Sequence, residues 1–207
     1  MFDKTLMLQN IDKWWADNGD VTRRLNYDHL TEDSVIMDLG GFNGDWTANM
    51  VNKYNCTSHI FEPVEHLIKG IASRFAGDKR VKCYDVAVGN EKKKCKIYHG
   101  EDETSLFSLG SEENFDTIKM VEVEDVFNKI GLDFVDVIKL NIEGGEFDLL
   151  DAIIAKNIQP KLGNLQIQFH KVADDSIERR ESICKELSKT HVRTWNYPWV
   201  WENWELK

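Results

Sequence analysis

The chain has 207 residues, of which 42% are hydrophobic and 30% are charged, a composition that excludes an intrinsically disordered protein. Its apolar stretches are too short to span a bilayer. Asp and Glu number 36 against 26 Lys and Arg, and the net charge of -10 disfavours a nucleic-acid partner, because nucleic-acid binding depends on neutralising phosphates.

Cysteine spacing and the N-terminal residues indicate the cellular compartment of the protein. The four cysteines (Cys56, Cys83, Cys95 and Cys184) show no C-x-x-C spacing, so neither a zinc site nor a disulfide scaffold is predicted. Residues 1–8 lack the basic start and apolar core of a secretion signal. We therefore expect a reduced, cytoplasmic protein.

A single domain is expected, with a helical lead-in over residues 1–33 and an α/β core over residues 34–207. Apolar residues at helical spacing predict an amphipathic helix over residues 6–15. Arg23 and Arg24 follow it. The two arginines either form a solvated face or close over an anionic part of a substrate.

The motif that organises the core is an apolar stretch over residues 35–39, then a glycine-rich turn, then a segment with helical spacing. This order predicts a strand, a tight turn and a helix, as in nucleotide-binding α/β folds. Gly40 and Gly44 allow positive φ angles and close approach to a ligand. Phe42 stands where a dinucleotide fingerprint has its second glycine, which argues against a dinucleotide.

Two acidic residues refine the expected ligand. Asp38, inside the first predicted strand, can hold the cationic amino group of a methionine-like moiety; the alternative is an acid that caps the turn. Glu62 ends the second predicted strand, where a carboxylate can accept both ribose hydroxyls of an adenosine. Together the two acids favour S-adenosylmethionine (SAM).

The hydrophobic pattern after Glu62 alternates between helices and strands. The expected elements are helix 64–75, strand 81–88, added strands 94–99 and 118–123, helix 123–130, strand 134–142, helix 146–156, strand 164–169, a helix from about 176, and an extended tail over 192–206. We predict an α/β, Rossmann-like fold with a mostly parallel central sheet, helices on both faces and an added β-hairpin.

In such sheets, ligands bind beyond the carboxyl ends of the strands. Polar or glycine-rich residues stand at all five predicted ends: residues 38–45, Glu62, Asp85, Asn141 with Glu143, and His170. Unrelated solvated loops would not need acids at successive strand ends. These residues are therefore expected to converge on one site.

Three stretches, over residues 36–44, 61–63 and 137–146, resemble the FkbM-type methyltransferases, a class I SAM-dependent family. The resemblance covers roughly residues 24–170, and its third stretch is the most diagnostic. Members typically methylate hydroxyl groups, often on the sugars of glycans or on secondary metabolites. The resemblance therefore implies a class I methyltransferase fold and SAM as cofactor.

The resemblance also implies roles for single residues. The methionine end of SAM would lie on the turn after the first strand, at Asp38, Gly40, Gly41, Phe42, Asn43 and Gly44. Glu62 would bind the ribose, and Asp85 with Val86 would border the adenine. Asn141 would hydrogen-bond the ligand, and Ser105 lies in a segment similar to a small-residue loop near the family's active site.

Two positions depart from the family pattern. Asn141 stands where an Asp is usual, and Gln168 stands where an acid is common. A hard divalent cation prefers several carboxylate oxygens, so we expect no metal.

A sugar hydroxyl is a poor nucleophile, so a base within reach of it would help. His170 has the better ordinary pKa for this role, and Glu143 is the alternative. The competing interpretations are a satisfied turn histidine and a carboxylate that holds Lys139. Lys139 itself can polarise the acceptor or balance the nearby acids.

The tail is rich in tryptophan. Trp195, Tyr197, Trp199 and Trp201 would share one face of a single strand, as a platform for a sugar ring or, more commonly, as core packing. Trp199 is the candidate substrate contact. Pro198 places this segment at an edge or a bend.

The predicted function is SAM-dependent O-methylation of a sugar hydroxyl, in a glycan or an activated sugar, in connection with a glycosyltransferase domain or partner. Two alternatives remain: methylation of a small non-sugar metabolite, and a SAM-binding module without turnover. The acidic composition and the lack of an N-P-P-Y strand end make nucleic-acid methylation the weaker choice.

Overall fold

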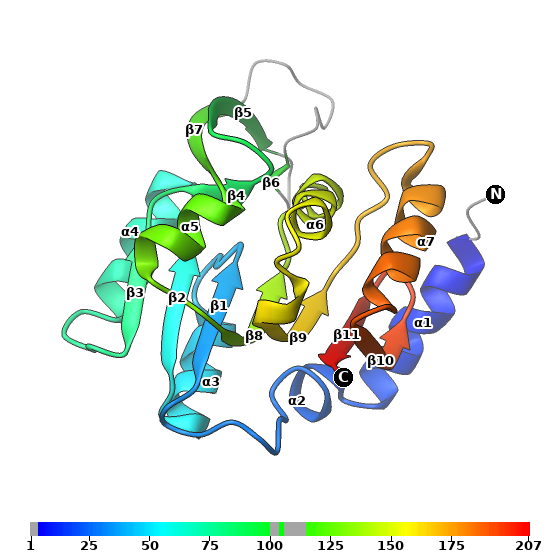
Figure 1. Cartoon of the computed structure of the whole chain (residues 1–207), viewed down its shortest axis with the longest axis horizontal. Coiled ribbons are helices and arrows are strands. Elements are labelled where there is room, and N and C mark those ends of the chain that lie inside the picture. Colours follow the sequence, from blue (N-terminus) through cyan, green and yellow to red (C-terminus); the bar gives the residue numbers. More distant parts are fainter. Residues whose placement is uncertain (1–3, 100–103, 106–114) are drawn as a thin grey trace.

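The computed structural model describes residues 4–99, 104–105 and 115–207. Within these residues, seven strands form a central sheet with the order β10-β11-β9-β8-β1-β2-β3 (Figure 1). The strands are β1 Val35–Leu39, β2 Thr57–Phe61, β3 Val81–Tyr84, β8 Val135–Leu140, β9 Leu162–Ile167, β10 His191–Tyr197 and β11 Trp201–Leu206.

Strand β1 lies in the interior of this sheet and pairs in parallel with β2 on one side and with β8 on the other. β3 and β9 continue the parallel pairing outward. β11 is antiparallel to both β9 and β10. The chain order therefore reverses at β1, which is where doubly wound sheets bind their ligands.

Helices cover both faces of the sheet, as predicted. They are α1 Lys4–Ala16, α2 Gly19–Thr22, α3 Asp45–Tyr54, α4 Glu65–Arg74, α5 Val123–Ile130, α6 Glu146–Ala155 and α7 Ser176–Leu187, with the 3-10 turn Gln159–Lys161. Apolar residues of α3 and α4 pack in one hydrophobic cluster, and those of α5, α6 and α7 in another. Neighbouring strand residues alternate between the clusters: Ile36 joins the first and Met37 the second.

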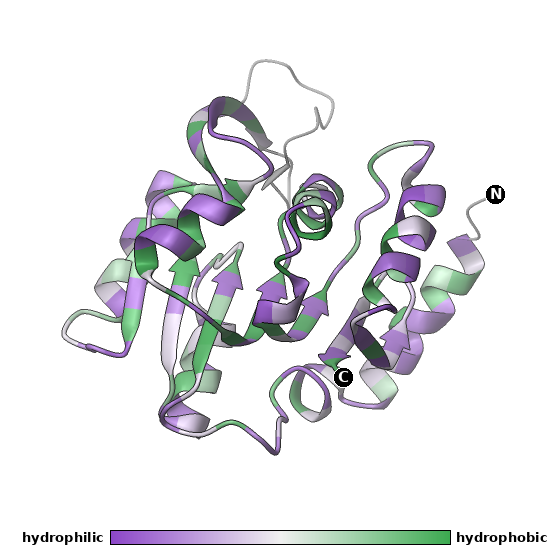
Figure 2. Ribbon diagram, in the orientation of Figure 1, coloured by the Kyte–Doolittle hydropathy of each residue, from purple (hydrophilic) through white to green (hydrophobic). Residues whose placement is uncertain are grey.

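The outer sides of the helices are largely hydrophilic, whereas the central strands carry many hydrophobic residues (Figure 2). Among the described residues, no helix is both long and apolar enough to cross a membrane.

A second sheet extends one edge of the molecule and contains the added strands predicted from the sequence. Its order is β4-β7-β5-β6, with β4 Ala87–Gly89, β5 Lys93–His99, β6 Thr104–Ser105 and β7 Phe115–Glu122. β5 and β7 pair antiparallel, which confirms the predicted hairpin.

The prediction of one strand over residues 81–88 is wrong. β3 ends at Tyr84, and the chain then joins the second sheet as β4. Asp85 lies at the break with a side chain 72% exposed, 3.9 Å from the Nζ atom of Lys119. The chain leaves the central sheet at this exposed residue, and β4 pairs with β7 in the second sheet instead.

The prediction of a single extended tail is also wrong. β10 and β11 form an antiparallel hairpin, and Trp199 adopts a φ of 64° in the turn between them. Because the chain reverses there, Trp199 does not share a strand face with the other aromatic residues. Pro198 lies in the same turn, which confirms the predicted bend. Trp195, Tyr197 and the nearby Trp201 pack with Trp14 of α1, so they serve as core.

The backbone of the loop after β1 packs closely against the backbone at the end of β8. Gly40 has a φ of 79°, and a Cβ atom built there would lie 1.9 Å from the main-chain oxygen of Asn141. Only glycine permits both this backbone conformation and this approach. The contact fixes the two strand ends that face the ligand side of the sheet.

Gly40→Ala is expected to lower the free energy of unfolding by more than about 2 kcal/mol, because it adds a backbone clash to the strain of a positive φ. Denaturant unfolding measures this change. Gly77→Ala is the matched control: Gly77 has a φ of 85° but nothing within 4 Å of an added Cβ, so only about 1 kcal/mol of conformational cost is expected. Equal losses in the two variants would contradict the close contact.

Candidate active site

A cavity of about 620 Å³ lies over the carboxyl ends of β1, β2 and β8, within the usual size range of small-molecule sites. Its lining comes from the segment around α2, the loop after β1, the junction of β2 and α4, the second sheet and the loop after β8. The cavity therefore lies where the reversal of strand order predicts a ligand.

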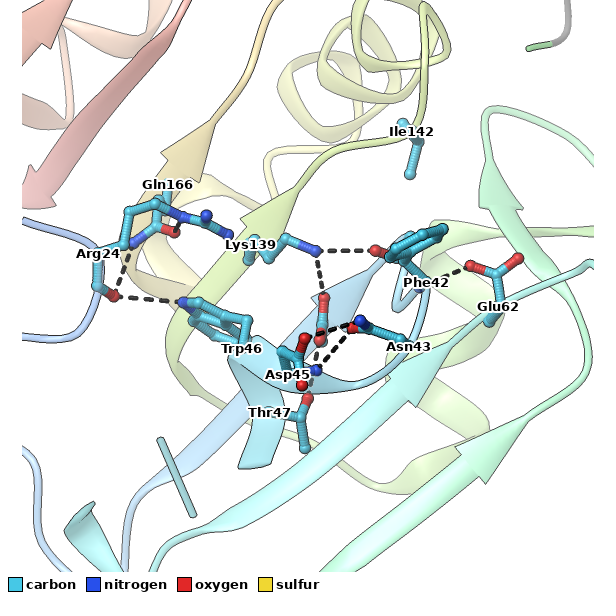
Figure 3. A network of polar contacts seen from close by, with 12 residues as sticks. Arg24, Phe42, Asn43, Asp45, Trp46, Thr47, Glu62, Lys139, Ile142 and Gln166 are labelled. Atoms are coloured by element: carbon cyan, nitrogen blue, oxygen red, sulfur yellow. Dashed lines mark hydrogen bonds and ion pairs between the residues drawn. The ribbon is translucent and has the colours of Figure 1, made fainter. Parts of the chain in front are cut away.

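Directly below the loop after β1 is a buried ion pair. The Nζ atom of Lys139 lies 2.7 Å from Oδ1 of Asp38 and donates a 2.8 Å hydrogen bond to the carbonyl of Gly40 (Figure 3). The hydroxyl of Thr47 donates to the other carboxylate oxygen of Asp38 at 2.8 Å. Burial lowers the pKa of Lys139 from its ordinary value, while Asp38 opposes that shift.

This arrangement supports the structural interpretation of both residues. Asp38 is fully buried and does not line the cavity, so it holds the loop from below and does not face a ligand. Lys139 does line the cavity, but its ammonium group is bonded to Asp38 and Gly40. Its geometry is that of a cation balancing a buried acid.

Glu62 lines the cavity at the end of β2 and is almost completely buried. One carboxylate oxygen accepts from the amide of Phe42 at 2.9 Å and the other from the amide of Val64 at 3.0 Å. Burial raises the pKa of Glu62, and these two amide bonds oppose the shift. Two backbone donors thus fix the carboxylate in the cavity wall.

The loop itself brings its main chain close to the cavity. A Cβ at Gly41 would lie 2.5 Å from the side chain of Ile60, so the backbone packs directly on β2. Asn43 lines the cavity and accepts from the amide of Asp45, while Gly44 lies just before α3 with a φ of 79°. Phe42 has a φ of 51° and a side chain 63% exposed, at the cavity.

The side-chain oxygen of Asn141 is the most informative atom of the site. It is buried, and the described part of the chain offers it no hydrogen-bond partner. Asn141 lines the cavity directly after β8. A buried acceptor without a donor costs about 1–3 kcal/mol, and a cationic or hydroxyl ligand would satisfy it.

Glu143 is positioned by His170, which is held in turn by Glu146. It lines the cavity with a φ of 50°, and its Oε2 atom lies 3.1 Å from Nε2 of His170. Nδ1 of the same ring lies 2.8 Å from Oε1 of the buried Glu146. Glu146 in turn accepts from the amides of Ile142 and Gly144.

Both ring nitrogens of His170 thus lie within hydrogen-bond distance of carboxylate oxygens, so the ring links Glu143 to the buried Glu146. His170 does not line the cavity. The geometry makes Glu143, supported by His170, the better candidate for a base.

Three other predicted residues, Asp85, Val86 and Trp199, are not part of the described cavity wall. Asp85 and Val86 do not line it, although the adjacent Ala87 and Val88 do. Trp199 packs beside the core formed with α7. The backbone of Ser105 lies in β6, and its side chain is outside the described residues.

Sequence reasoning missed the apolar part of the cavity, formed by Val64, Leu67, Val88, Ile97 and Ile118. Their helix and strand spacing reads as core packing, because the second sheet that brings them together is a tertiary feature. Among the described residues, no group of three or more His, Cys, Asp and Glu side chains could hold a metal ion. Metal independence stays a prediction.

The family profile described as the methyltransferase FkbM domain matches residues 38–191. The chain belongs to the FkbM methyltransferase family. It is a methyltransferase, and its methyl donor is SAM. No curated protein matches the sequence.

Two solved structures of similar fold support the architecture. A Streptococcus mutans protein proposed to be a methyltransferase, crystallised with S-adenosylhomocysteine (SAH), is 14% identical with a TM-score of 0.55 over 100% of both chains. An rRNA methylase of Streptococcus thermophilus is 14% identical with a TM-score of 0.53, over 86% of this chain and 89% of that one. At such identity these likenesses show a shared class I fold.

Lys139→Met is expected to lower the free energy of unfolding by about 3–5 kcal/mol, because it leaves the buried Asp38 carboxylate without its cation. Lys69→Met is the control: it breaks an ion pair with Glu65 in which both side chains are well exposed, so less than about 1 kcal/mol should be lost. Denaturant unfolding of both variants measures the difference. A Lys139→Met loss no larger than the control's would show that the pair does not hold the loop.

Proposed function

We propose that this protein is a SAM-dependent O-methyltransferase whose acceptor is a sugar hydroxyl, in a glycan or an activated sugar. The observation that carries the proposal is the carboxylate of Glu143 in the cavity wall, two residues from the unsatisfied Asn141 and fixed by His170. A neutral hydroxyl needs such a base, whereas the tightly paired cation Lys139 offers none.

The described groups fit SAM in one orientation. Glu62 accepts the ribose hydroxyls, since its fixed carboxylate lies in the cavity wall. The apolar part of the cavity around Val88 and Ile118 takes the adenine. The orphan oxygen of Asn141 accepts from the α-ammonium group, a role that an amide performs without the negative charge of the family's usual Asp.

When bound, SAM supplies an electrophilic methyl group on its sulfonium. Glu143 accepts the proton of the acceptor hydroxyl as the new O–C bond forms and the S–C bond breaks, leaving SAH. His170 positions Glu143, and Glu146 orients His170 through the second ring nitrogen. Alignment of acceptor and methyl group supplies much of the remaining rate.

Phe42 supports an acceptor with a flat apolar face. It is an exposed aromatic side chain at the cavity, and its backbone is tied to Glu62. Aromatic rings pack well on the apolar faces of pyranoses. The net charge of -10 favours a sugar over a nucleic acid, and a glycosyltransferase partner would be the natural source of a glycan acceptor.

Two rival functions have distinct outcomes in one experiment. Transfer from radiolabelled SAM is measured with monosaccharides, nucleotide sugars and oligosaccharides, beside phenols and aliphatic alcohols. Label on a sugar oxygen supports the proposal, and label only on non-sugar alcohols supports a metabolite methyltransferase. SAH binding without transfer to any acceptor indicates a binding module. The native Asn141, which stands where the family usually has Asp, is the feature that favours this outcome.

Glu62→Gln is expected to weaken SAH binding roughly 10- to 100-fold at neutral pH, since hydroxyls bond a charged carboxylate more strongly than an amide. Burial raises the pKa of Glu62 above its ordinary 4.5. SAH affinity of the native protein should therefore fall as pH falls through that raised pKa, and the variant should lack this dependence. Calorimetry across pH tests it, with the exposed Glu65→Gln as control. A native affinity independent of pH down to 4.5 would argue against the ribose contact.

Glu143→Gln is expected to lower kcat by about 10²- to 10⁴-fold while leaving SAH affinity within about threefold, because it removes the base and keeps the cavity shape. Initial rates with the acceptor found above measure kcat, and calorimetry measures the affinity. His170→Gln should lower kcat less and shift the pH profile, as a positioning residue does. Unchanged turnover in Glu143→Gln would rule out Glu143 as the base.

A further inference from the structure

An arginine outside the family match lines the same cavity. Arg24 precedes residues 38–191, yet it contributes to the cavity wall beside the loop after β1. Its side chain is only 17% exposed. The lead-in segment therefore contributes a cationic side chain to the cavity wall.

Arg24 is held in a fixed orientation. Its Nε donates to Oε1 of Gln166 at 3.1 Å (Figure 3), and its NH1 lies 2.8 Å from Oδ1 of Asp20. Its guanidinium stacks 4.1 Å above the ring of Trp201. Among the described contacts, these use two of the five N–H donors of the guanidinium, and a planar fork held this way suits a carboxylate.

The position of Arg24 relative to β8 decides which part of the ligand it meets. Gln166 pairs with Lys139 of β8, and Asn141 follows two residues later, directly after the strand ends. The orphan oxygen of Asn141 and the guanidinium of Arg24 thus belong to the same end of the cavity. Lys139 is at this end of the cavity as well, but its ammonium group is already bonded to Asp38 and to the carbonyl of Gly40.

We propose that Arg24 binds the α-carboxylate of the methionine moiety of SAM, opposite the ammonium contact of Asn141. The two residues then match the two charges of a zwitterion, with a cation for the carboxylate and an uncharged acceptor for the ammonium. The inference rests on the proposed placement of SAM in this cavity. The remaining lining cation, Lys93, lies on β5 in the second sheet, which forms the part of the cavity assigned to the adenine.

Calorimetry with SAH and with decarboxylated SAH, which keeps the ammonium group but lacks the carboxylate, tests this role without any acceptor. The native protein is expected to bind SAH roughly 10- to 100-fold more tightly than the decarboxylated ligand. In Arg24→Gln, SAH should weaken to about that level while decarboxylated SAH changes less than twofold. Arg24→Lys should recover part of the SAH affinity.

Arg23→Gln is the matched control, since Arg23 is the exposed neighbour and does not line the cavity; it should leave both affinities unchanged. Thermal unfolding checks that each variant is folded. If Arg24→Gln does not fold, the comparison of the two ligands on the native protein still tests whether the carboxylate is recognised. Equal affinity of the native protein for both ligands, or equal losses for both in Arg24→Gln, overturns the role of Arg24. No SAH binding by the native protein would instead overturn the proposed placement of SAM.

Discussion

The buried ion pair between Asp38 and Lys139 is the interaction on which the site depends. It joins β1 to β8 at the centre of the sheet, and the same ammonium group holds the carbonyl of Gly40. Two buried charges cost several kcal/mol to desolvate and repay it only with good geometry. The pair therefore admits one arrangement of the two strand ends, with Gly40 pressed against the main chain of Asn141.

The candidate site residues come directly after the strands that this junction fixes. Asn141 and Glu143 extend directly from β8, and Glu62 extends from β2, so their side chains inherit the geometry of the sheet. Glu143 adopts a positive φ that a non-glycine residue rarely tolerates, and its link through His170 to the buried Glu146 is in place to hold it there. Strain at this position is what one expects of a residue placed for function.

Local patterns predicted what depends on local sequence. The strand, turn and helix around Gly40, the helix after Glu62 and the parallel order of the core all follow from periodicity and glycine placement. The bend at Asp85 depends on which sheet each segment joins, and the reversal at Trp199 depends on the pairing of β11 with β9 and β10. Periodicity encodes neither. Asp38 and Arg24 show the same limit: their roles are set by Lys139 and Gln166, more than 100 residues away along the chain.

A crystal structure of the protein with SAH bound tests the placement of the cofactor most directly. It should show the ribose hydroxyls on the carboxylate of Glu62, the α-ammonium on the side-chain oxygen of Asn141 and the adenine against Val88. SAH bound outside this cavity, or bound in it with its amino-acid end toward Ile118, would contradict the site derived from the buried pair and the strand ends above it.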